Sequence, residues 1–166
     1  MKNEDLFHVA EYIRLSRDDG DKAESDSIIN QKKLLADYLS GRETLLLYDI
    51  YIDDGFSGTN YERPAFRRMI GDIDAGKVNC VIVKDLSRFG RDYIDTGRYL
   101  ERYFPERNVR FISVTDNIDS FEQAYDMLLP IKNIFNEQYA RDISRKIHAS
   151  VLTKQKAGEF IGAFTS

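Results

Sequence analysis

Four short segments of the chain are rich in Val, Ile, Leu, Tyr and Phe, a composition typical of β-strands. They read HVAEYIRL (8–15), TLLLYDIYID (44–53), NCVIVKD (79–85) and VRFISVTD (109–116). Segments with apolar residues at helical spacing lie between them, at 25–43, 63–77 and 95–108. Strands that alternate with helices predict an α/β fold, with a mostly parallel central sheet flanked by helices.

The three helical segments carry residues that typically mark helix ends. The first begins with Ser25 and Asp26, whose side chains can cap a helix. In the second, Pro64 fits the first turn and Gly76 fits the exit. We expect Pro105 to stop the third, because proline cannot continue a helix.

A fourth helical pattern fills the last third of the chain, from about residue 127 to 157. Its apolar positions are spaced by four, at Phe135, Tyr139, Ile143, Ile147 and Val151. Pro130 fits only its first turn or a kink. Such a helix spans roughly 40 Å, more than a domain of this size needs for itself. We therefore expect self-association through its apolar stripe; the alternative is a helix packed wholly within one chain.

These patterns predict three regions. Residues 1–126 form an α/β domain, residues 127–157 form the long helix, and residues 158–166 form a linker. The final KAGEFIGAFTS is glycine-rich and mildly apolar, so we expect a larger parent protein.

Composition narrows the classes of function. The 166 residues are 42% hydrophobic and carry a formal net charge of -4, so any nucleic-acid contact must be local or supplemented by another region. Cys80 is the single cysteine, which excludes an internal disulfide. His8 and His148 are far apart in sequence and lack nearby cysteines, which argues against a metal site. No signal peptide or membrane span is recognisable, so we expect a soluble intracellular protein.

Polar residues follow three of the predicted strands. Ligands of open parallel sheets gather at the carboxyl ends of strands. The first strand ends in YIRLSRDD, the second in YIDDGFSGTNYERP, and the third in VKDLSRFGRD. Folding is therefore expected to bring five side chains towards one edge of the sheet: Arg14, Ser16, Asp53, Arg88 and Arg91.

The first strand end alternates between polar and apolar positions. Tyr12, Arg14 and Ser16 should project to one face, and Ile13 and Leu15 should pack on the other. A purely structural alternative remains open, in which Arg14 pairs with a carboxylate and Ser16 caps the following loop.

The third strand end places two arginines three residues apart. If a helix begins near Ser87, Arg88 and Arg91 share a face and repel each other unless an anion lies between them. Guanidinium groups match phosphate oxygens in bidentate pairs. The alternative is ion pairing with Asp85, Asp92 or Asp95.

A serine beside arginines, with no evident histidine base, points away from a Ser-His-Asp triad and towards phosphoryl transfer. The sequence lacks the phosphate-binding loop GxxxxGK[ST] and the Gly-rich dinucleotide fingerprint. The phosphate is therefore expected to belong to a polymer.

Four motifs in order resemble the catalytic domain of serine recombinases. They are YIRLS, YIDDGFSGTNYERP, VIVKDLSRFGRD and NEQYARDISRKI. The similarity is greatest to the large serine recombinases, meaning phage integrases and transposases, and it runs from about Val9 to Phe164. It implies a resolvase-like α/β catalytic domain with a long C-terminal helix.

The resemblance implies that Ser16 is the nucleophile that attacks a DNA phosphodiester. The 5′ phosphate becomes esterified to the serine, the 3′ hydroxyl is released, and strands rejoin without ATP, metal or another cofactor. Arg14, Arg88 and Arg91 would cradle the scissile phosphate.

The resemblance also implies supporting roles and partners. Tyr12 would shape the pocket, and Asp53 and Arg63 match the supporting acidic and basic positions. Further contacts to DNA phosphates would come from Lys84, Arg141, Arg145 and Lys146. The partners would be DNA and a second copy of the chain, with two dimers forming a tetramer and no membrane involved. The setting would be the cytoplasm, with the protein encoded by a bacterium or phage.

The chain departs from the family pattern at three points. Small resolvases and invertases carry an aspartate where this chain has Ser87, so acid–base help would have to come from Asp85 or Asp53, or the arginines would suffice. Relatives carry Glu-Arg where this chain has Arg145-Lys146. Large serine recombinases continue into DNA-binding domains, usually with a zinc ribbon, and sequence-specific affinity is expected to lie there.

Two other functions fit parts of the sequence. A receiver-like domain that takes phosphate on aspartate with Mg²⁺ would use Asp18, Asp19, Asp53 or Asp54, and Lys84, but would leave the arginines without a role. A catalytically silent dimerisation module would need neither Ser16 nor the arginines.

Overall fold

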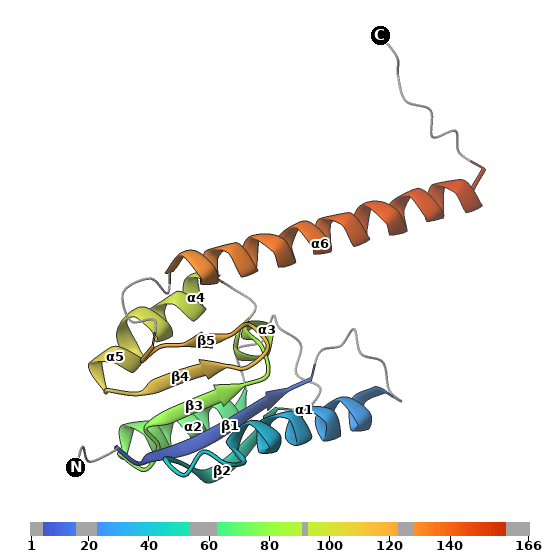
Figure 1. Cartoon of the computed structure of the whole chain (residues 1–166). Coiled ribbons are helices and arrows are strands. Elements are labelled where there is room, and N and C mark those ends of the chain that lie inside the picture. Colours follow the sequence, from blue (N-terminus) through green and yellow to red (C-terminus); the bar gives the residue numbers. More distant parts are fainter. Residues whose placement is uncertain (1–4, 16–22, 54–62, 91–92, 123–127, 159–166) are drawn as a thin grey trace. The chain divides into compact units, whose positions relative to one another are not determined.

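The computed structural model describes residues 5–15, 23–53, 63–90, 93–122 and 128–158 (Figure 1). Five strands form one sheet in the order β2-β1-β3-β4-β5. The parallel strands are β1 (Phe7–Arg14), β2 (Leu45–Asp53), β3 (Cys80–Val83) and β4 (Arg110–Ser113). The predicted α/β class with a mostly parallel sheet is confirmed.

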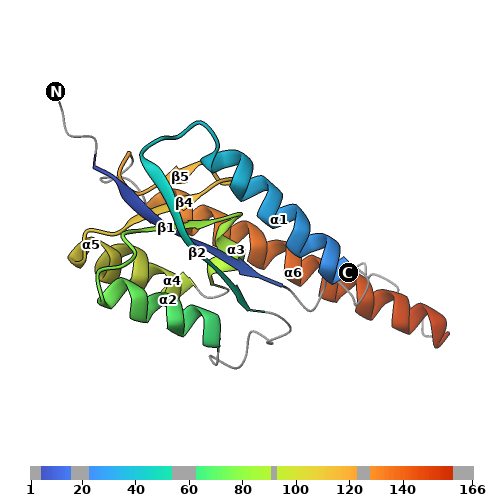
Figure 2. The ribbon, with the colours of Figure 1, turned by 90° about the horizontal axis from the view of Figure 1, so that it is seen from below.

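Helices cover both faces of the sheet (Figure 2). α1 (Ala23–Leu39) lies on one face, and the other face carries α2, α3, α4 and α5. Their bounds are Pro64–Asp74, Leu86–Phe89, Tyr93–Arg98 and Phe104–Glu106, and a π-helical turn, η2 (Tyr99–Tyr103), joins α4 to α5. Pro64 occupies the first turn of α2, as predicted.

The two faces have different cores. The α1 face buries aliphatic side chains such as Val9, Ile13 and Leu35. The opposite face is aromatic. Edge-to-face contacts join Phe66, Phe89, Tyr99 and Phe111, and Phe104 makes a tilted contact with Tyr99. Each fully buried side chain of this size contributes about 1.5–3 kcal/mol. The aromatic layer therefore fixes the position of α2, α3 and η2 relative to the strand ends.

A fifth strand was not predicted. β5 (Ile118–Asp119) pairs antiparallel with β4 after a turn at Asn117, which has a φ of 53°. Arg110 and Asp119 form a two-pronged ion pair across the two strands, with distances of 3.1 and 2.6 Å. Two residues are too short for a recognisable pattern, so this strand depends on tertiary pairing.

The expected stop at Pro105 is wrong, because the helix ends one residue later. Phe104 N–H bonds to the carbonyl oxygen of Tyr99, which widens the helix into the π-turn. The α-helical turn then restarts at Phe104, and Pro105 takes an early position where its missing N–H costs no hydrogen bond. The helix ends at Glu106 instead.

The long helix is also observed. α6 (Leu128–Lys156) has 29 residues and a length of about 43 Å. Pro130 lies in its first turn, as the sequence predicted. By its internal contacts the chain divides into two units, Met1–Leu128 and Leu129–Ser166. No helix in the described ranges is long and apolar enough to cross a membrane.

Candidate active site

The end of β1 sends polar side chains to one face and apolar side chains to the other, as the alternation predicted. Ile13 joins the aliphatic core on the α1 side, while Tyr12 and Arg14 contact groups on the opposite side. Both polar side chains belong to buried residues. Ser16, the predicted nucleophile, lies two residues beyond the end of β1 and outside the described residues.

Asp53, at the end of β2, organises the start of α2. Its carboxylate accepts hydrogen bonds from Ala65 N–H at 2.9 Å and Phe66 N–H at 3.0 Å. These N–H groups have no partner within the helix, so Asp53 acts as a cap from a neighbouring strand. Oδ2 also accepts from the Tyr12 hydroxyl at 2.9 Å, and the residue is only 1% exposed. Asp53 therefore ties β1, β2 and α2 together.

Arg63 lies just before α2 and links it to the other strand ends. Its guanidinium donates to the carbonyl oxygen of Phe89 at 2.5 Å and reaches the Tyr12 hydroxyl at 3.4 Å. It also lies over the ring of Phe66, with its Cζ 4.0 Å from the ring centroid. The stacked guanidinium is held by packing as well as by hydrogen bonds.

Burial raises the pKa of the Tyr12 phenol, and the neighbouring Asp53 carboxylate raises it further, against the opposing effect of Arg63. The hydroxyl therefore stays protonated at physiological pH and acts as a donor to Asp53. Tyr12 can orient other groups but cannot serve as a phenolate base.

The side chains of Arg14 and Arg88 each donate a hydrogen bond to the backbone of the other residue. Arg14 Nε donates to the carbonyl oxygen of Arg88 at 3.1 Å, and Nη2 donates to that of Ser87. Arg88 Nη1 donates in return to the carbonyl oxygen of Arg14 at 3.2 Å. All three acceptors are neutral carbonyl groups. These bonds therefore orient the pair at the carboxyl edge of the sheet without neutralising its charge.

The expected helix near Ser87 is shorter than its pattern suggested. α3 spans Leu86–Phe89, and Gly90 already has extended backbone, with φ of -155° and ψ of 156°. Arg91 itself lies outside the described residues. The ion-pair alternative holds in part, because Arg88 Nε lies 3.9 Å from Asp85.

Ser87 lies in α3 and contacts Asp85. The Ser87 hydroxyl donates to Asp85 Oδ1, which also accepts from Arg88 N–H at 3.3 Å. Asp85 is thus the cap of α3. Its side chain is 20% exposed, whereas Asp53 is almost fully buried.

Asp116 was not among the residues predicted from the sequence. This carboxylate follows β4 and accepts from Leu86 N–H and from the Ser113 hydroxyl, each at 2.7 Å. It fixes the start of α3 from a fourth strand end. The rule that polar residues gather where parallel strands end could have found it, because VRFISVTD closes on this aspartate.

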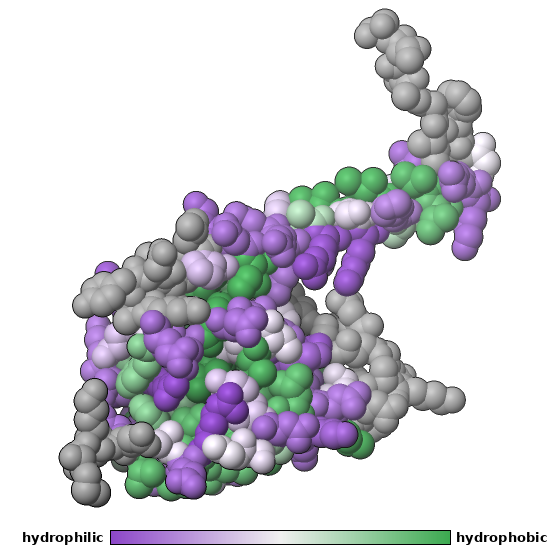
Figure 3. All heavy atoms as spheres, in the orientation of Figure 1, coloured by the Kyte–Doolittle hydropathy of each residue, from purple (hydrophilic) through white to green (hydrophobic). Residues whose placement is uncertain are grey.

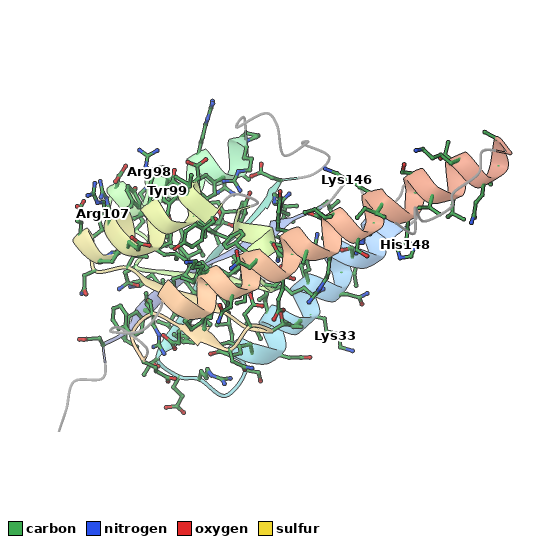
Figure 4. All side chains as sticks on the ribbon, turned by 90° about the horizontal axis from the view of Figure 1, so that it is seen from above. Lys33, Arg98, Tyr99, Arg107, Lys146 and His148 are labelled. Carbon is green, nitrogen blue, oxygen red and sulfur yellow. The ribbon has the colours of Figure 1, made fainter. Side chains whose placement is uncertain are left out.

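The remaining candidates are Lys84 and three residues of α6. Lys84 follows β3, and its carbonyl oxygen accepts from the Thr115 backbone at 2.9 Å. Arg141, Arg145 and Lys146 are exposed residues of α6, where Arg141 lies 3.5 Å from Glu137. Lys146 projects from the helix surface (Figure 4). These three belong to the second unit.

Possible metal ligands and the single thiol complete the set of candidates. No group of three or more His, Cys, Asp or Glu residues within the described ranges is arranged to hold a metal ion. Cys80 is buried in β3, and burial raises the pKa of its thiol to about 12, so it remains a core residue.

Comparisons with known proteins agree with this geometry. A family model described as "Resolvase, N terminal domain" matches residues 9–160. The N-terminal catalytic domain of TP901-1 integrase is 30% identical, with a TM-score of 0.63, over 82% of this chain and 98% of that one. A resolvase family site-specific recombinase from Streptococcus pneumoniae is 29% identical, with a TM-score of 0.61, over 92% and 99%. The C-terminal catalytic domain of ISC1926 TnpA, an IS607-like serine recombinase, shares the fold at 20% identity and a TM-score of 0.53, over 64% and 70%.

Proposed function

Because this chain belongs to the resolvase N-terminal domain family, the catalytic domain of serine recombinases, we propose that it breaks and rejoins DNA through a covalent bond to Ser16. The Ser16 oxygen attacks a backbone phosphorus, and the bond from phosphorus to the 3′ oxygen breaks. The serine proton is lost and the leaving 3′ oxygen gains one. A 3′ hydroxyl of another strand then attacks the phosphoserine ester, so the bonds broken and formed balance.

The observation that carries this proposal is the reciprocal bonding of Arg14 and Arg88. Each side chain is anchored by the backbone of the other, so both guanidinium groups are positioned before any ligand arrives. Negative charge on the phosphoryl oxygens grows during transfer, and preorganised cations stabilise it. Ser16 follows Arg14 by two residues in the sequence. Arg91 is proposed as the third guanidinium.

Tyr12, Asp53 and Arg63 are proposed as positioning residues. Their hydrogen bonds join β1, β2 and α2, and none of the three needs to touch the phosphate to matter. We propose Asp85, and not Asp53, as the carboxylate that assists proton transfer, which is the role proposed for the aspartate of small resolvases and invertases. Asp53 is sealed at 1% exposure and bonded to three donors, whereas Asp85 retains access to solvent.

Assembly is proposed to use α6. Tyr139, Ile143 and Ile147 lie on successive turns and are 70%, 39% and 57% exposed (Figure 3). Such an apolar stripe on an isolated helix favours pairing with a second copy. Dimers that assemble into a tetramer would hold two DNA duplexes, with Arg141, Arg145 and Lys146 available for phosphates.

The experiment is capture of the covalent intermediate. The protein is incubated with DNA that carries its recombination site, denatured in detergent, and digested with nuclease. Mass spectrometry should find a nucleotide phosphate on Ser16. Ser16→Ala should abolish the adduct. Ser40→Ala, an exposed serine at the end of α1, should leave it intact.

The outcomes separate the competing functions. An adduct that persists in Ser16→Ala, or that maps to another residue, would contradict the proposed nucleophile. Phosphate transferred to an aspartate from a small donor with Mg²⁺ would instead indicate a receiver. Assembly on DNA with no adduct of either kind would indicate a silent dimerisation module.

A further inference from the structure

A groove of about 790 Å³ lies between α2 and the α4–η2 segment, outside the Arg14–Arg88 pair. Its volume is in the range that holds a nucleotide-sized ligand. Arg98 and Tyr99 lie on this edge of the domain (Figure 4). Six of its lining residues carry the argument: Arg63, Arg67, Arg98, Arg102, Tyr99 and Tyr103.

The groove is positively charged although the whole chain is negative. Four arginines line it against two carboxylates, Asp95 and Glu106. In the described part of the chain, Arg98 alone among the four is paired with a lining carboxylate, at 3.8 Å from Asp95. Within the same residues, the side chains of Arg67 and Arg102 make no hydrogen bond or ion pair. Exposed arginines that gather without carboxylate partners favour an anionic ligand.

The aromatic residues of the groove are already used in packing. Tyr99 makes edge-to-face contacts with Phe66 and Phe89, and Arg107 lies 3.8 Å from the centroid of the Tyr103 ring. Packing therefore uses part of the surface of both rings, which leaves less of it for stacking with a nucleobase. What the groove offers is guanidinium groups and a phenol donor, which suit phosphate oxygens. Burial raises the pKa of Tyr99, so that phenol stays protonated.

The shape of the groove depends on the π-turn. Tyr99, Arg102 and Tyr103 all belong to η2, and the wider turn changes the angular spacing of their side chains. Such turns cost stability and are frequent at functional sites. Tyr103 is held in place by a hydrogen bond of 2.8 Å to Asp74, so η2 is fastened to the end of α2.

The groove is continuous with the candidate active site through Arg63. This residue lines the groove and also bonds to Phe89 and Tyr12. We propose that the groove binds the sugar–phosphate backbone of DNA beside the phosphate that Arg14 and Arg88 hold. Arg67 and Arg102 are the ligand-binding residues, and the contact is independent of base sequence. This inference rests on the proposed function, because it takes the same DNA strand as its ligand.

The test compares two double variants of equal charge. Arg67→Gln with Arg102→Gln removes the two arginines of the groove. Arg42→Gln with Arg68→Gln is the matched control, because Arg42 lies over the Tyr38 ring, Arg68 pairs with Asp49, and neither arginine lines the groove. Binding of the whole chain to a short mixed-sequence duplex is measured by fluorescence anisotropy over a range of salt concentrations.

The groove variant should bind DNA about tenfold more weakly. The slope of the logarithm of its binding constant against the logarithm of salt concentration should become less steep by about 0.9 for each phosphate that it no longer binds. The control should change both quantities much less. Equal losses in the two variants would show a net-charge effect and overturn the inference. Competition by inorganic phosphate or adenosine monophosphate as effective as by duplex DNA would also overturn it, since the ligand would then be a free phosphate.

Failure of this inference is distinguishable from failure of the cleavage mechanism. If the Ser16 adduct forms but both double variants bind DNA equally, only the groove assignment is wrong. If the groove variant selectively loses DNA but the full-length protein never forms an adduct, the groove stands and the proposed cleavage is wrong.

Discussion

Arg14 and Arg88 donate hydrogen bonds to each other's backbone carbonyl oxygens, at 3.1 and 3.2 Å, although they are 74 positions apart. The exchange joins the end of β1 to α3. It orients two like charges through carbonyl groups, while Asp85 lies 3.9 Å from Arg88. Two guanidinium groups held in this way lower the cost of binding a phosphate, since their orientation is fixed before the ligand arrives.

Replacing Arg88 should separate catalysis from folding. Arg88→Ala should reduce formation of the Ser16 adduct by about 100-fold or more, because one preorganised cation is removed. The missing hydrogen bond to Arg14 should cost about 1 kcal/mol of unfolding free energy. Adduct yield and urea denaturation measure the two effects. If the variant unfolds but its folded fraction cleaves normally, Arg88 is only structural.

Replacing Asp53 should mainly destabilise the fold. Asp53→Ala removes the acceptor for Ala65, Phe66 and Tyr12, and leaves buried donors without a partner. A loss of about 3 kcal/mol or more is expected. Tyr12→Phe should cost about 1 kcal/mol, because only one donor disappears.

A double-mutant cycle checks this assignment, with urea denaturation as the measurement. The effects of Asp53→Ala and Tyr12→Phe should be strongly non-additive, since both remove the same hydrogen bond. Additive effects would contradict the direct contact.

Glu11 should make stability depend on pH. It is 2% exposed in β1, and burial raises its pKa from 4.5 to about 7, partly offset by Lys32. The folded state therefore binds this proton more tightly than the unfolded state. Unfolding free energy should fall as pH rises from about 4.5 to 7, by about 3 kcal/mol in total, and then level off.

The matching variant for this prediction is Glu11→Gln, which keeps the shape of the side chain and cannot ionise. Its unfolding free energy should lose most of the pH dependence over that window, as measured by urea denaturation at several pH values. A wild-type protein with constant or rising stability between pH 5 and 7 would be incompatible with the raised pKa.

A charge on the exposed stripe of α6 should weaken self-association. Ile143→Glu places a carboxylate among apolar side chains, whereas Ser144→Glu adds the same charge at an exposed polar position. Sedimentation should show a smaller assembly for Ile143→Glu only. Identical sedimentation of the two variants would mean that the stripe is not the interface.

Several features could be predicted because they depend on local patterns. The alternation in YIRLS placed Tyr12 opposite Ile13, as observed, and the long periodic stretch predicted α6 to within a residue at each end. The parallel sheet followed from alternating strands and helices, and parallel strands bring their carboxyl ends to one edge. That rule anticipated the meeting of Arg14, Asp53 and Arg88.

Other features depend on partners distant in sequence. From the sequence, Asp53 was expected to be an acidic residue of the active site. In the structure it accepts hydrogen bonds from the first turn of α2 and therefore caps that helix. The helix expected near Ser87 already ends at Phe89, and the expected face shared by Arg88 and Arg91 is not tested because Arg91 lies outside the described residues.

The sequence by itself determined the fold class and the alternation of strands with helices. Hydrophobic periodicity and strand order are properties of the chain, so they can be read without coordinates. Only the tertiary structure decided that backbone carbonyls anchor the arginines, that Pro105 follows a π-turn, and that Arg67 and Arg102 line one groove. Hydrogen bonds and packing between distant segments depend on distances of a few tenths of an ångström, and residue spacing does not encode them.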